Sequence, residues 1–255
     1  MLFTIIIQAR CCSSRFPNKV LKKIKKKSLL EFMIERLSTV FLKKNIIVAT
    51  TSSKKDNKLV SIFKKKKINY FRGSEDNVLK RYINCCTKFN VQNVVHLTSD
   101  CPLVDLELLD RMIRYFKKNK FDYLANTYPP SKSTYPDGTD IEIYKFSSLK
   151  KLAKLTSQKE DKEHVTNFFW KNPTKFKTYT YKNKYNISNF KYSIDYKNEL
   201  GLIKEIVKYS DNNKLELSAE NIVKIIKKNK KLKKISLLNL NKFKRNRKDL
   251  YPIKQ

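Results

Sequence analysis

Three cations and two carboxylates stand where the sequence predicts that strands end. Arg10, Arg15 and Lys19 lie in "QARCCSSRFPNK", directly after an apolar run that is typical of a buried strand. Asp100 follows the strand-like "NVVHLTS", and Asp195 ends the strand-like "KYSID" just before a predicted helix. A carboxylate at such a turn often only caps the helix, which is the simpler interpretation of either Asp taken alone.

Taken together, these five side chains favour another interpretation. Two carboxylates that converge in a crevice repel each other by about 4 kcal/mol at about 4 Å for an effective dielectric constant near 20. A divalent cation turns that repulsion into a binding site, and Mg²⁺ typically takes one or two carboxylates together with phosphate oxygens and water. Cations on the opposite wall would neutralise the rest of a triphosphate. The set therefore fits nucleotidyl transfer, with the basic loop holding the phosphates of a nucleoside triphosphate.

Other common sites are excluded by missing motifs. The chain has no GxGxxG, GxxxxGK[ST] or GxSxG segment, so the usual dinucleotide, P-loop and nucleophile-elbow patterns are absent. Two histidines are too few for a multi-histidine metal site, and His96, inside a predicted strand, is expected to be a core residue. Five cysteines, four of them in adjacent pairs, lack the spacing of a zinc site and indicate reduced thiols. With no signal-peptide pattern, we expect a cytoplasmic protein.

The strong positive charge offers an alternative function. Lys and Arg number 57 against 23 Asp and Glu, and the resulting net charge of +34 ordinarily suggests a nucleic-acid partner. The excess is mostly Lys and is spread along the chain, as in "KKIKKK" and "IIKKNKKLKK", beside abundant Asn and Ile and only three Gly. Codon bias toward A+T would produce this composition, so we favour solvated lysine faces and expect no specific nucleic-acid partner. No apolar run approaches the roughly 20 residues that cross a membrane.

The period of the apolar residues predicts an α/β fold. Strand-like segments alternate with helical ones through the first half of the chain, which is typical of a doubly wound, mostly parallel sheet with helices on both faces. Strands are expected at 2–8, 45–50, 68–71, 93–99, 122–127, 141–146, 175–181 and 191–195, and helices at 29–41, 56–66, 74–89, 106–118, 147–155, 159–170 and 218–232. We predict a nucleotidyltransferase domain at 1–210 and a C-terminal helical extension at 211–255 packed on it. Ligands of such sheets bind beyond the carboxyl ends of the strands, where the basic loop lies.

Several ordered motifs resemble one enzyme family. "QARCCSSRFPNKVL" is similar to the N-terminal signature of the sugar-acid cytidylyltransferases, loosely A-R-x-G-S-x-R-x-P-G-K. "FRGSEDNVLKRY", "TSDCPLVD", "TYPDGTDIEIY", "KEHVTNFF" and "YSIDYKNEL" follow in the family's order, so the likeness covers nearly the whole chain. It is greatest to the spore-coat-polysaccharide type, which is related to the CMP-Kdo and acylneuraminate synthetases. Cys12 and Asn18 stand where the family usually has Gly, and a Cβ at Cys12 would narrow the approach to phosphate.

The resemblance implies that CTP and a sugar acid react to give a CMP-sugar and pyrophosphate for surface polysaccharide, with Mg²⁺ as the cofactor. It implies Arg10, Arg15, Lys19, Asp100 and Asp195 as catalytic residues, with Asp100 and Asp195 as the metal ligands. The nucleotide-binding residues would be Gln8, Ala9, Arg10, Ser13, Ser14, Lys19, Arg72, Gly73, Ser74, Asn77, Thr98 and Asp100. Of these, Arg72, Gly73 and Ser74 are expected near the cytosine, although a simple helix cap is a strong alternative for Ser74.

The acceptor would meet a second set of residues. By the same resemblance, the sugar-binding residues are Tyr135, Asp137, Gly138, Asp140, Glu163 and His164. His164 would contact a hydroxyl or carboxylate of the sugar, or else be a packed surface histidine. Another nucleotide or acceptor on the same fold stays open, and the terminal helices are expected either to cover the active site or to form a homodimer contact.

Overall fold

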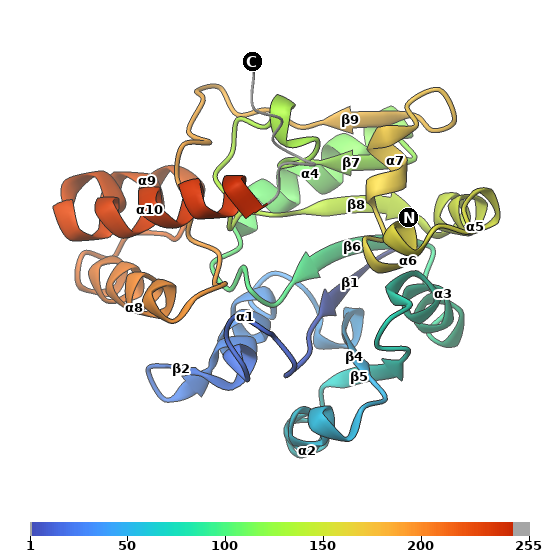
Figure 1. Cartoon of the computed structure of the whole chain (residues 1–255), viewed down its shortest axis with the longest axis horizontal. Helices are drawn as coiled ribbons and strands as arrows, with labels where there is room; N and C mark the ends of the chain where they lie inside the picture. The colour runs from blue at the N-terminus through green and yellow to red at the C-terminus, as the bar shows by residue number, and fades with distance from the viewer. Residues whose placement is uncertain (1, 247–255) are drawn as a thin grey trace.

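A seven-stranded, mostly parallel sheet organises the protein, and its structure, a computed structural model, describes residues 2–246. The strands are β1 (Phe3–Gln8), β4 (Ile46–Thr51), β5 (Asn69–Gly73), β6 (Asn93–Thr98), β7 (Tyr123–Ala125), β8 (Glu142–Lys145) and β9 (Thr178–Thr180). They lie in the order β5-β4-β1-β6-β8-β7-β9, and β8 runs antiparallel to both of its neighbours (Figure 1). A small hairpin, β2 (Lys23–Ile24) and β3 (Lys27–Ser28), stands apart from this sheet. The predicted doubly wound fold is confirmed.

Helices cover both faces of the sheet and one of its sides. The first face packs against α1 (Leu29–Leu37), α2 (Asn57–Lys66) and α4 (Leu106–Asn119), and the second against α3 (Val78–Lys88), α5 (Phe146–Leu155) and α7 (Asn167–Lys171). The short helix α6 (Lys159–Glu163) lies against α3. A third apolar cluster joins α8 (Lys197–Asn212), α9 (Ala219–Lys228) and α10 (Lys230–Asn246). Figure 1 shows these three helices beside the ends of β1 and β6. Short 3₁₀ turns lie at Lys19–Leu21, Lys43–Asn45, Lys54–Asp56 and Pro130–Lys132.

Local sequence explains where these elements begin. The apolar run of β1 is buried on both faces, as a central parallel strand requires. Ser28 and Glu31 form a capping box at α1: the Ser28 hydroxyl accepts the Glu31 N–H at 3.2 Å, and the Glu31 carboxylate accepts the Ser28 N–H at 2.9 Å. Asp105 caps α4 by accepting the Leu108 N–H at 2.8 Å.

Several predicted elements differ from the structure, among them the helix predicted at 29–41, which ends at Leu37. The helix predicted from residue 74 begins at Val78, because Asn77 accepts the Lys80 N–H and takes the cap position. The helix predicted at 159–170 is two short helices separated at 164–166, and that predicted at 218–232 breaks at Asn229. Residues 191–195 form no strand; they make only an isolated bridge between Asp137 and Lys191. At Asn229 the side-chain oxygen accepts the N–H groups of Lys231 at 3.0 Å and Leu232 at 3.1 Å, so this residue caps the helix that follows.

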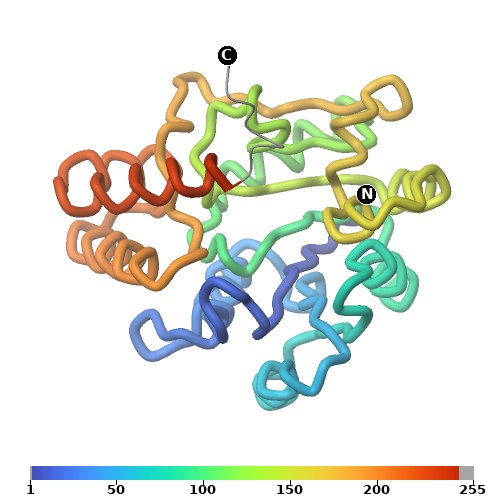
Figure 2. The backbone as a smooth tube through the Cα atoms, viewed as in Figure 1, coloured from blue at the N-terminus to red at the C-terminus, as the bar shows by residue number. Residues whose placement is uncertain are grey.

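Three segments distant in the sequence meet beyond the carboxyl ends of β1 and β6. Figure 2 shows the blue chain after β1, the green chain after β6 and the orange chain before α8 approaching one another. The Ile194 N–H donates to the Asp100 carbonyl at 2.8 Å, and Lys19 reaches the Ile194 carbonyl at 2.7 Å. The predicted boundary at 210/211 falls near the end of α8 and stays a prediction. Within 2–246, no helix has both the length and the apolar character of a membrane span.

Candidate active site

A buried carboxylate fixes the loop that follows β1. Asp56 is 1% exposed, and its Oδ1 accepts the Cys11 N–H at 2.7 Å while its Oδ2 accepts the Thr51 N–H at 3.2 Å. Burial by itself would raise the pKa of Asp56, but hydrogen bonds from Thr51, Cys11 and Thr50 lower it below its ordinary value. Asn18 has φ 56°, so it adopts the left-handed conformation that Asn tolerates. These contacts hold the loop in one defined turn.

The predicted cations and carboxylates converge at the end of this loop. The Lys19 ammonium lies 3.0 Å from Asp100 Oδ2 and 3.7 Å from Asp195 Oδ1. Arg15 donates from its guanidinium to Asp195 Oδ1 at 2.6 Å. Asp100 and Asp195, which are 95 positions apart in the sequence, thus flank one ammonium group. Arg10 lies on the same loop with an exposed side chain.

Opposing charges determine how these groups ionise. Burial by itself would raise the pKa of Asp100, but the Lys19 ammonium and a hydrogen bond from Thr98 outweigh it and lower the pKa to about 2. Burial acts to lower the pKa of Lys19, and Asp100 and Asp195 raise it above its ordinary value. Asp100 is therefore an anion and Lys19 a cation throughout the neutral range.

Two cavities meet at this cluster. The first, which we call the cationic cavity, has a volume of about 220 Å³. It is lined by Gln8, Arg10, Cys12, Ser13, Ser14, Arg15, Lys19, Thr98, Ser99, Asp100 and Asp195. The structure thus brings together most of the residues predicted to bind the triphosphate, whereas Ala9 is buried behind them. Cys12 lines the cavity and is not among the residues of 2–246 with positive φ, so its backbone needs no glycine.

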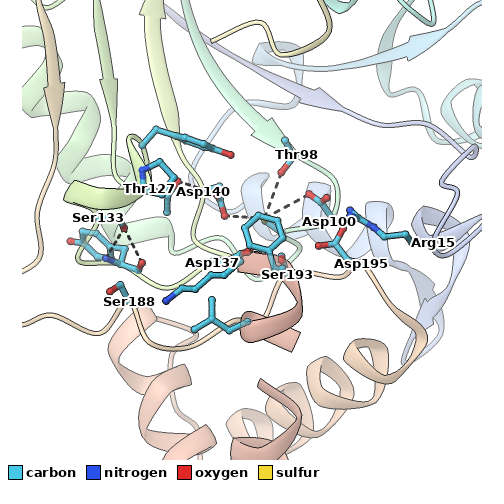
Figure 3. A pocket seen from close by; sticks show the side chains of 17 residues that line it. Arg15, Thr98, Asp100, Thr127, Ser133, Asp137, Asp140, Ser188, Ser193 and Asp195 are labelled. Atoms are coloured by element: carbon cyan, nitrogen blue, oxygen red, sulfur yellow. Dashed lines mark hydrogen bonds and ion pairs between the residues drawn. The ribbon is translucent and has the colours of Figure 1, made fainter. Parts of the chain in front are cut away.

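The second cavity, which we call the acidic cavity, has a volume of about 240 Å³ and is drawn in Figure 3. It shares Arg15, Thr98, Asp100 and Asp195 with the cationic cavity. Its other lining residues are Cys101, Thr127, Tyr128, Pro130, Ser133, Tyr135, Asp137, Asp140, Ser188, Ser193, Leu240, Phe243 and Lys244. Figure 3 shows Thr127, Ser133 and Asp140 on the side away from Arg15. Hydroxyl and carboxyl groups dominate this cavity.

The turn at Gly138 shapes the acidic cavity. Gly138 has φ +117°, and a Cβ there would lie 2.5 Å from Tyr192 Cδ2 and 2.8 Å from the Ser193 nitrogen, so only glycine fits. Its N–H donates to Asp140 Oδ2 at 2.9 Å, and Thr127 Oγ1 donates to Asp140 Oδ1 at 2.8 Å. Burial, aided by the Asp140 and Asp195 charges, raises the pKa of Asp137 to about 7 although Lys191 opposes it.

The residues predicted to bind cytosine line neither cavity. Arg72 donates to the backbone carbonyls of Thr51 at 3.0 Å and Ser53 at 2.9 Å, so its side chain ties strands β4 and β5 together. Gly73 ends β5, where a Cβ would lie 2.8 Å from Arg81 Cγ. The Ser74 hydroxyl accepts the Asn77 N–H at 3.0 Å, and Asn77 caps α3. These contacts are structural, and a direct role in base binding stays a prediction.

Two residues predicted for the sugar also lie elsewhere. Glu163 is exposed at the end of α6, and His164 is half-buried as the residue that ends this helix. Neither lines the acidic cavity, whereas Tyr135, Asp137 and Asp140 do and Gly138 forms its turn. His96 is 5% exposed, which confirms it as a core residue.

Two components of the site are not among the predicted site residues, although the terminal helices were expected either to cover the active site or to form a homodimer contact. Lys191 is fully buried, and its ammonium lies 3.1 Å from Asp195 Oδ2. Because lysines are rarely buried, the residue type does not predict this position. Leu240, Phe243 and Lys244 of α10 line the acidic cavity from the far end of the chain. The alternation of the strand predicted at 191–195, which puts residues 191 and 195 on one face, is the one available signal for Lys191.

The predicted metal ligands fit a partial Mg²⁺ site. Asp100 and Asp195 supply hard oxygen donors at one place, and the low pKa of Asp100 keeps it ionised. Among residues 2–246, no group of three or more His, Cys, Asp or Glu side chains is arranged to hold a metal by itself. Such a site needs phosphate oxygens and water to complete it, as Mg²⁺ sites at triphosphates usually do.

Known proteins share this architecture. A family profile described as cytidylyltransferase matches residues 4–249. The chain is 26% identical over 233 residues to the spore coat polysaccharide biosynthesis protein SpsF of Bacillus subtilis, covering 88% of this chain and 93% of SpsF. A cytidylyltransferase structure from Leptospira borgpetersenii serovar Hardjo-bovis matches with a TM-score of 0.83 and 32% identity, covering 90% of this chain and 95% of that one. CMP:2-keto-3-deoxy-manno-octonic acid synthetase complexed with CTP shares the fold, with a TM-score of 0.59, 15% identity and coverage of 82% and 99% of the two chains.

Proposed function

The chain belongs to the cytidylyltransferase family, and on this premise we propose that it transfers CMP from CTP to a sugar acid in a Mg²⁺-dependent reaction. One observation carries the proposal: the cationic cavity and the acidic cavity meet at Asp100, Asp195 and Arg15. A triphosphate in the first cavity and an acceptor in the second would place the α-phosphorus beside the attacking hydroxyl.

In this reaction the acceptor oxygen forms a bond to the α-phosphorus as the bond to the pyrophosphate oxygen breaks, and the hydroxyl proton passes to water. Arg10, Arg15 and Lys19 hold the triphosphate and stabilise the charge that develops on pyrophosphate. Positioning and charge neutralisation of this kind supply most of the catalysis in such transfers. Asp100 and Asp195 would hold Mg²⁺, which when bound polarises the phosphate oxygens and lowers the pKa of the attacking hydroxyl.

The composition of the acidic cavity supports a polyhydroxylated acceptor. Hydroxyls and amides of a sugar find acceptors at Asp137 and Asp140, and the Ser and Thr side chains supply both donors and acceptors. Lys244 and Arg15 are the cations that line this cavity within residues 2–246, and they would face the acid group. The relation to SpsF, named for spore coat polysaccharide biosynthesis, and the shared fold of a 2-keto-3-deoxy-sugar-acid synthetase favour surface-polysaccharide precursors.

The direct test measures pyrophosphate release from CTP and Mg²⁺ with a panel of sugar acids. We expect release that depends on both the metal and the acceptor. Stabilisation in a thermal-shift assay, tested separately with CTP, UTP, GTP and ATP in Mg²⁺, ranks the bases, because selective binding raises the melting temperature. A preference for UTP or GTP would indicate another nucleotidyltransferase activity. If no pyrophosphate is released with a panel that contains the true acceptor, the proposal is overturned.

We propose further that the protein works in the cytoplasm, consistent with five free thiols at its cysteines. A homodimer, and the lack of a specific nucleic-acid partner, stay predictions. If the net charge of +34 acts only through nonspecific contacts, binding to duplex DNA should be lost by about 0.15 M salt. Tight, saturable binding at that salt concentration would favour the nucleic-acid alternative instead.

A further inference from the structure

Lys191 is a buried cation enclosed by carboxylates behind the active site. Its side chain is 0% exposed, and its ammonium lies 3.1 Å from Asp195 Oδ2 and 3.1 Å from Glu199 Oε1. Asp137 Oδ2 is 3.9 Å away, and the ammonium also donates to the Ser193 carbonyl at 3.2 Å. A charge without access to water is tolerated only where it is paired and hydrogen-bonded, so these contacts hold the lysine in one place.

The two oxygens of Asp195 consequently face different surroundings. Oδ1 accepts a hydrogen bond from the Arg15 guanidinium at 2.6 Å and lies 3.7 Å from the Lys19 ammonium, on the side of both cavities. Oδ2 is held by Lys191 on the buried side. The backbone on either side is fixed as well, because Glu199 Oε2 accepts the N–H groups of Asp195 at 2.5 Å and Tyr196 at 2.7 Å. Rotation of this carboxylate would break the contact with Lys191.

Helix α10 holds Lys191 in turn. The Lys191 N–H donates to the hydroxyl of the buried Ser236 at 2.8 Å, and the Phe243 ring centroid lies 5.6 Å from the ammonium. Phe243 also lines the acidic cavity. A chain of contacts therefore runs from the C-terminal helix through Lys191 to the carboxylate between the two cavities.

We propose that Lys191 is a positioning residue that fixes Asp195, so that Oδ1 alone is presented to the metal-bound triphosphate, with α10 as its support. This inference rests on the proposed function. It assigns α10 a part in the chemistry, in addition to packing. Groups that orient a metal ligand from behind typically change metal affinity or activity by about 10–100-fold when they are removed.

The test requires a variant that removes the ammonium without leaving buried charge. Lys191→Met alone leaves the buried Glu199 without its ion-pair partner, which endangers folding, whereas Asp195 keeps Arg15 and Lys19. The double variant Lys191→Met/Glu199→Gln removes one charge of each sign and keeps an amide oxygen that accepts the N–H groups at the start of α8. The matched control is Lys145→Met, because Lys145 pairs with Asp122 at 3.4 Å outside both cavities.

Two measurements are compared with wild type: steady-state pyrophosphate release, and calorimetric CTP binding with and without Mg²⁺. For the double variant we expect kcat, and the Mg²⁺ contribution to CTP affinity, to fall by about 10–100-fold. CTP affinity without metal should change little, since the cationic cavity keeps Arg10, Arg15 and Lys19. A residue with only a structural role would lower the melting temperature but would leave the metal-dependent part of binding unchanged.

The outcomes separate the two proposals. If wild type releases pyrophosphate and the double variant keeps wild-type kcat and metal-dependent binding, the positioning role is overturned and the enzyme function stands. If wild type binds Mg²⁺ and CTP without any turnover, the function fails, and the binding data alone decide the role of Lys191. Should the double variant not fold, Ser236→Ala decides: a several-fold loss of metal-dependent CTP affinity supports the inference, and wild-type binding overturns it.

Discussion

The cationic cavity and the acidic cavity share Arg15, Thr98, Asp100 and Asp195 but differ in everything else. The unshared charged residues of the first are Arg10 and Lys19, whereas those of the second are Asp137, Asp140 and Lys244. In a chain with a net charge of +34, a cavity with more carboxylates than cations is unusual. The contrast indicates two kinds of ligand. A polyanion would be held by ammonium and guanidinium groups in the cationic cavity, and a sugar with many hydrogen-bond donors would be held by oxygen acceptors in the acidic cavity.

Asp100 stands where the two cavities meet, so its removal should have the largest effect. We expect Asp100→Ala to lower kcat by about 10³-fold, which corresponds to about 4 kcal/mol of barrier, because the metal site and the anchor of Lys19 are lost together. Pyrophosphate release measures the loss, and an unchanged circular dichroism spectrum shows that the fold is intact. Activity within tenfold of wild type would show that Asp100 has no catalytic role in either cavity.

Arg15 tests whether the cationic side depends on geometry or only on charge. Arg15→Lys keeps the charge but loses the planar fork that reaches Asp195 Oδ1 at 2.6 Å. We expect kcat/KM for CTP to fall by about 10²-fold, the size of effect expected for one lost charge-stabilising donor. The matched control is Arg111→Lys. Arg111 pairs with Glu107 at 3.4 Å on an exposed helix face, so this substitution should leave kcat/KM unchanged. Equal effects of the two variants would contradict a geometric role.

Gly138 tests whether the acidic side depends on its backbone turn. Its φ is +117°, and a Cβ at this position would lie only 2.5 Å from Tyr192 Cδ2. Gly138→Ala should therefore lower the free energy of unfolding by about 1–3 kcal/mol and raise KM for the acceptor more than KM for CTP. Gly201→Ala is the control, since Gly201 lies in α8 and a Cβ there would meet nothing within 4 Å. That change should stabilise the helix by up to about 1 kcal/mol in urea denaturation. A stable Gly138→Ala protein with normal acceptor kinetics would show that the turn is tolerant.

The two cavities also differ in how far the sequence predicts them. The cationic cavity comes mostly from the continuous loop after β1 and from Asp100, which follows β6, so the strand pattern and local charge place Arg15, Lys19 and Asp100 at its lining. Asp195 lines it as well, although the strand expected at 191–195 does not form. The acidic cavity depends on how α10 packs against the chain before α8, and no local pattern encodes that contact between Ser236 and Lys191. The same limit applies within the fold: Ser74 and Asn77 are both good cap residues, and only the tertiary structure selects Asn77.

Ionisation provides the finest distinction between the cavities. The pKa of Asp100 is about 2, so this carboxylate stays charged across the neutral range, whereas burial raises the pKa of Asp137 to about 7. Below pH 7 Asp137 is mostly protonated and uncharged, and above it an anion faces the acceptor. Because the folded protein binds this proton more tightly than the unfolded chain does, the free energy of unfolding should fall as pH rises from about 4 to about 7.

A change of pH across this range should therefore alter KM for the acceptor but not KM for CTP. We expect KM for an acidic sugar to rise by up to about 10-fold between pH 6 and 8, since about 1.4 kcal/mol of repulsion is enough for that change. KM for CTP should stay nearly constant, because Asp100 does not titrate there. Asp137→Asn cannot ionise, so it should flatten the acceptor profile and leave the CTP profile as it was. If the acceptor profile of Asp137→Asn still rises through pH 7, another group titrates in the acidic cavity and the assignment to Asp137 is wrong.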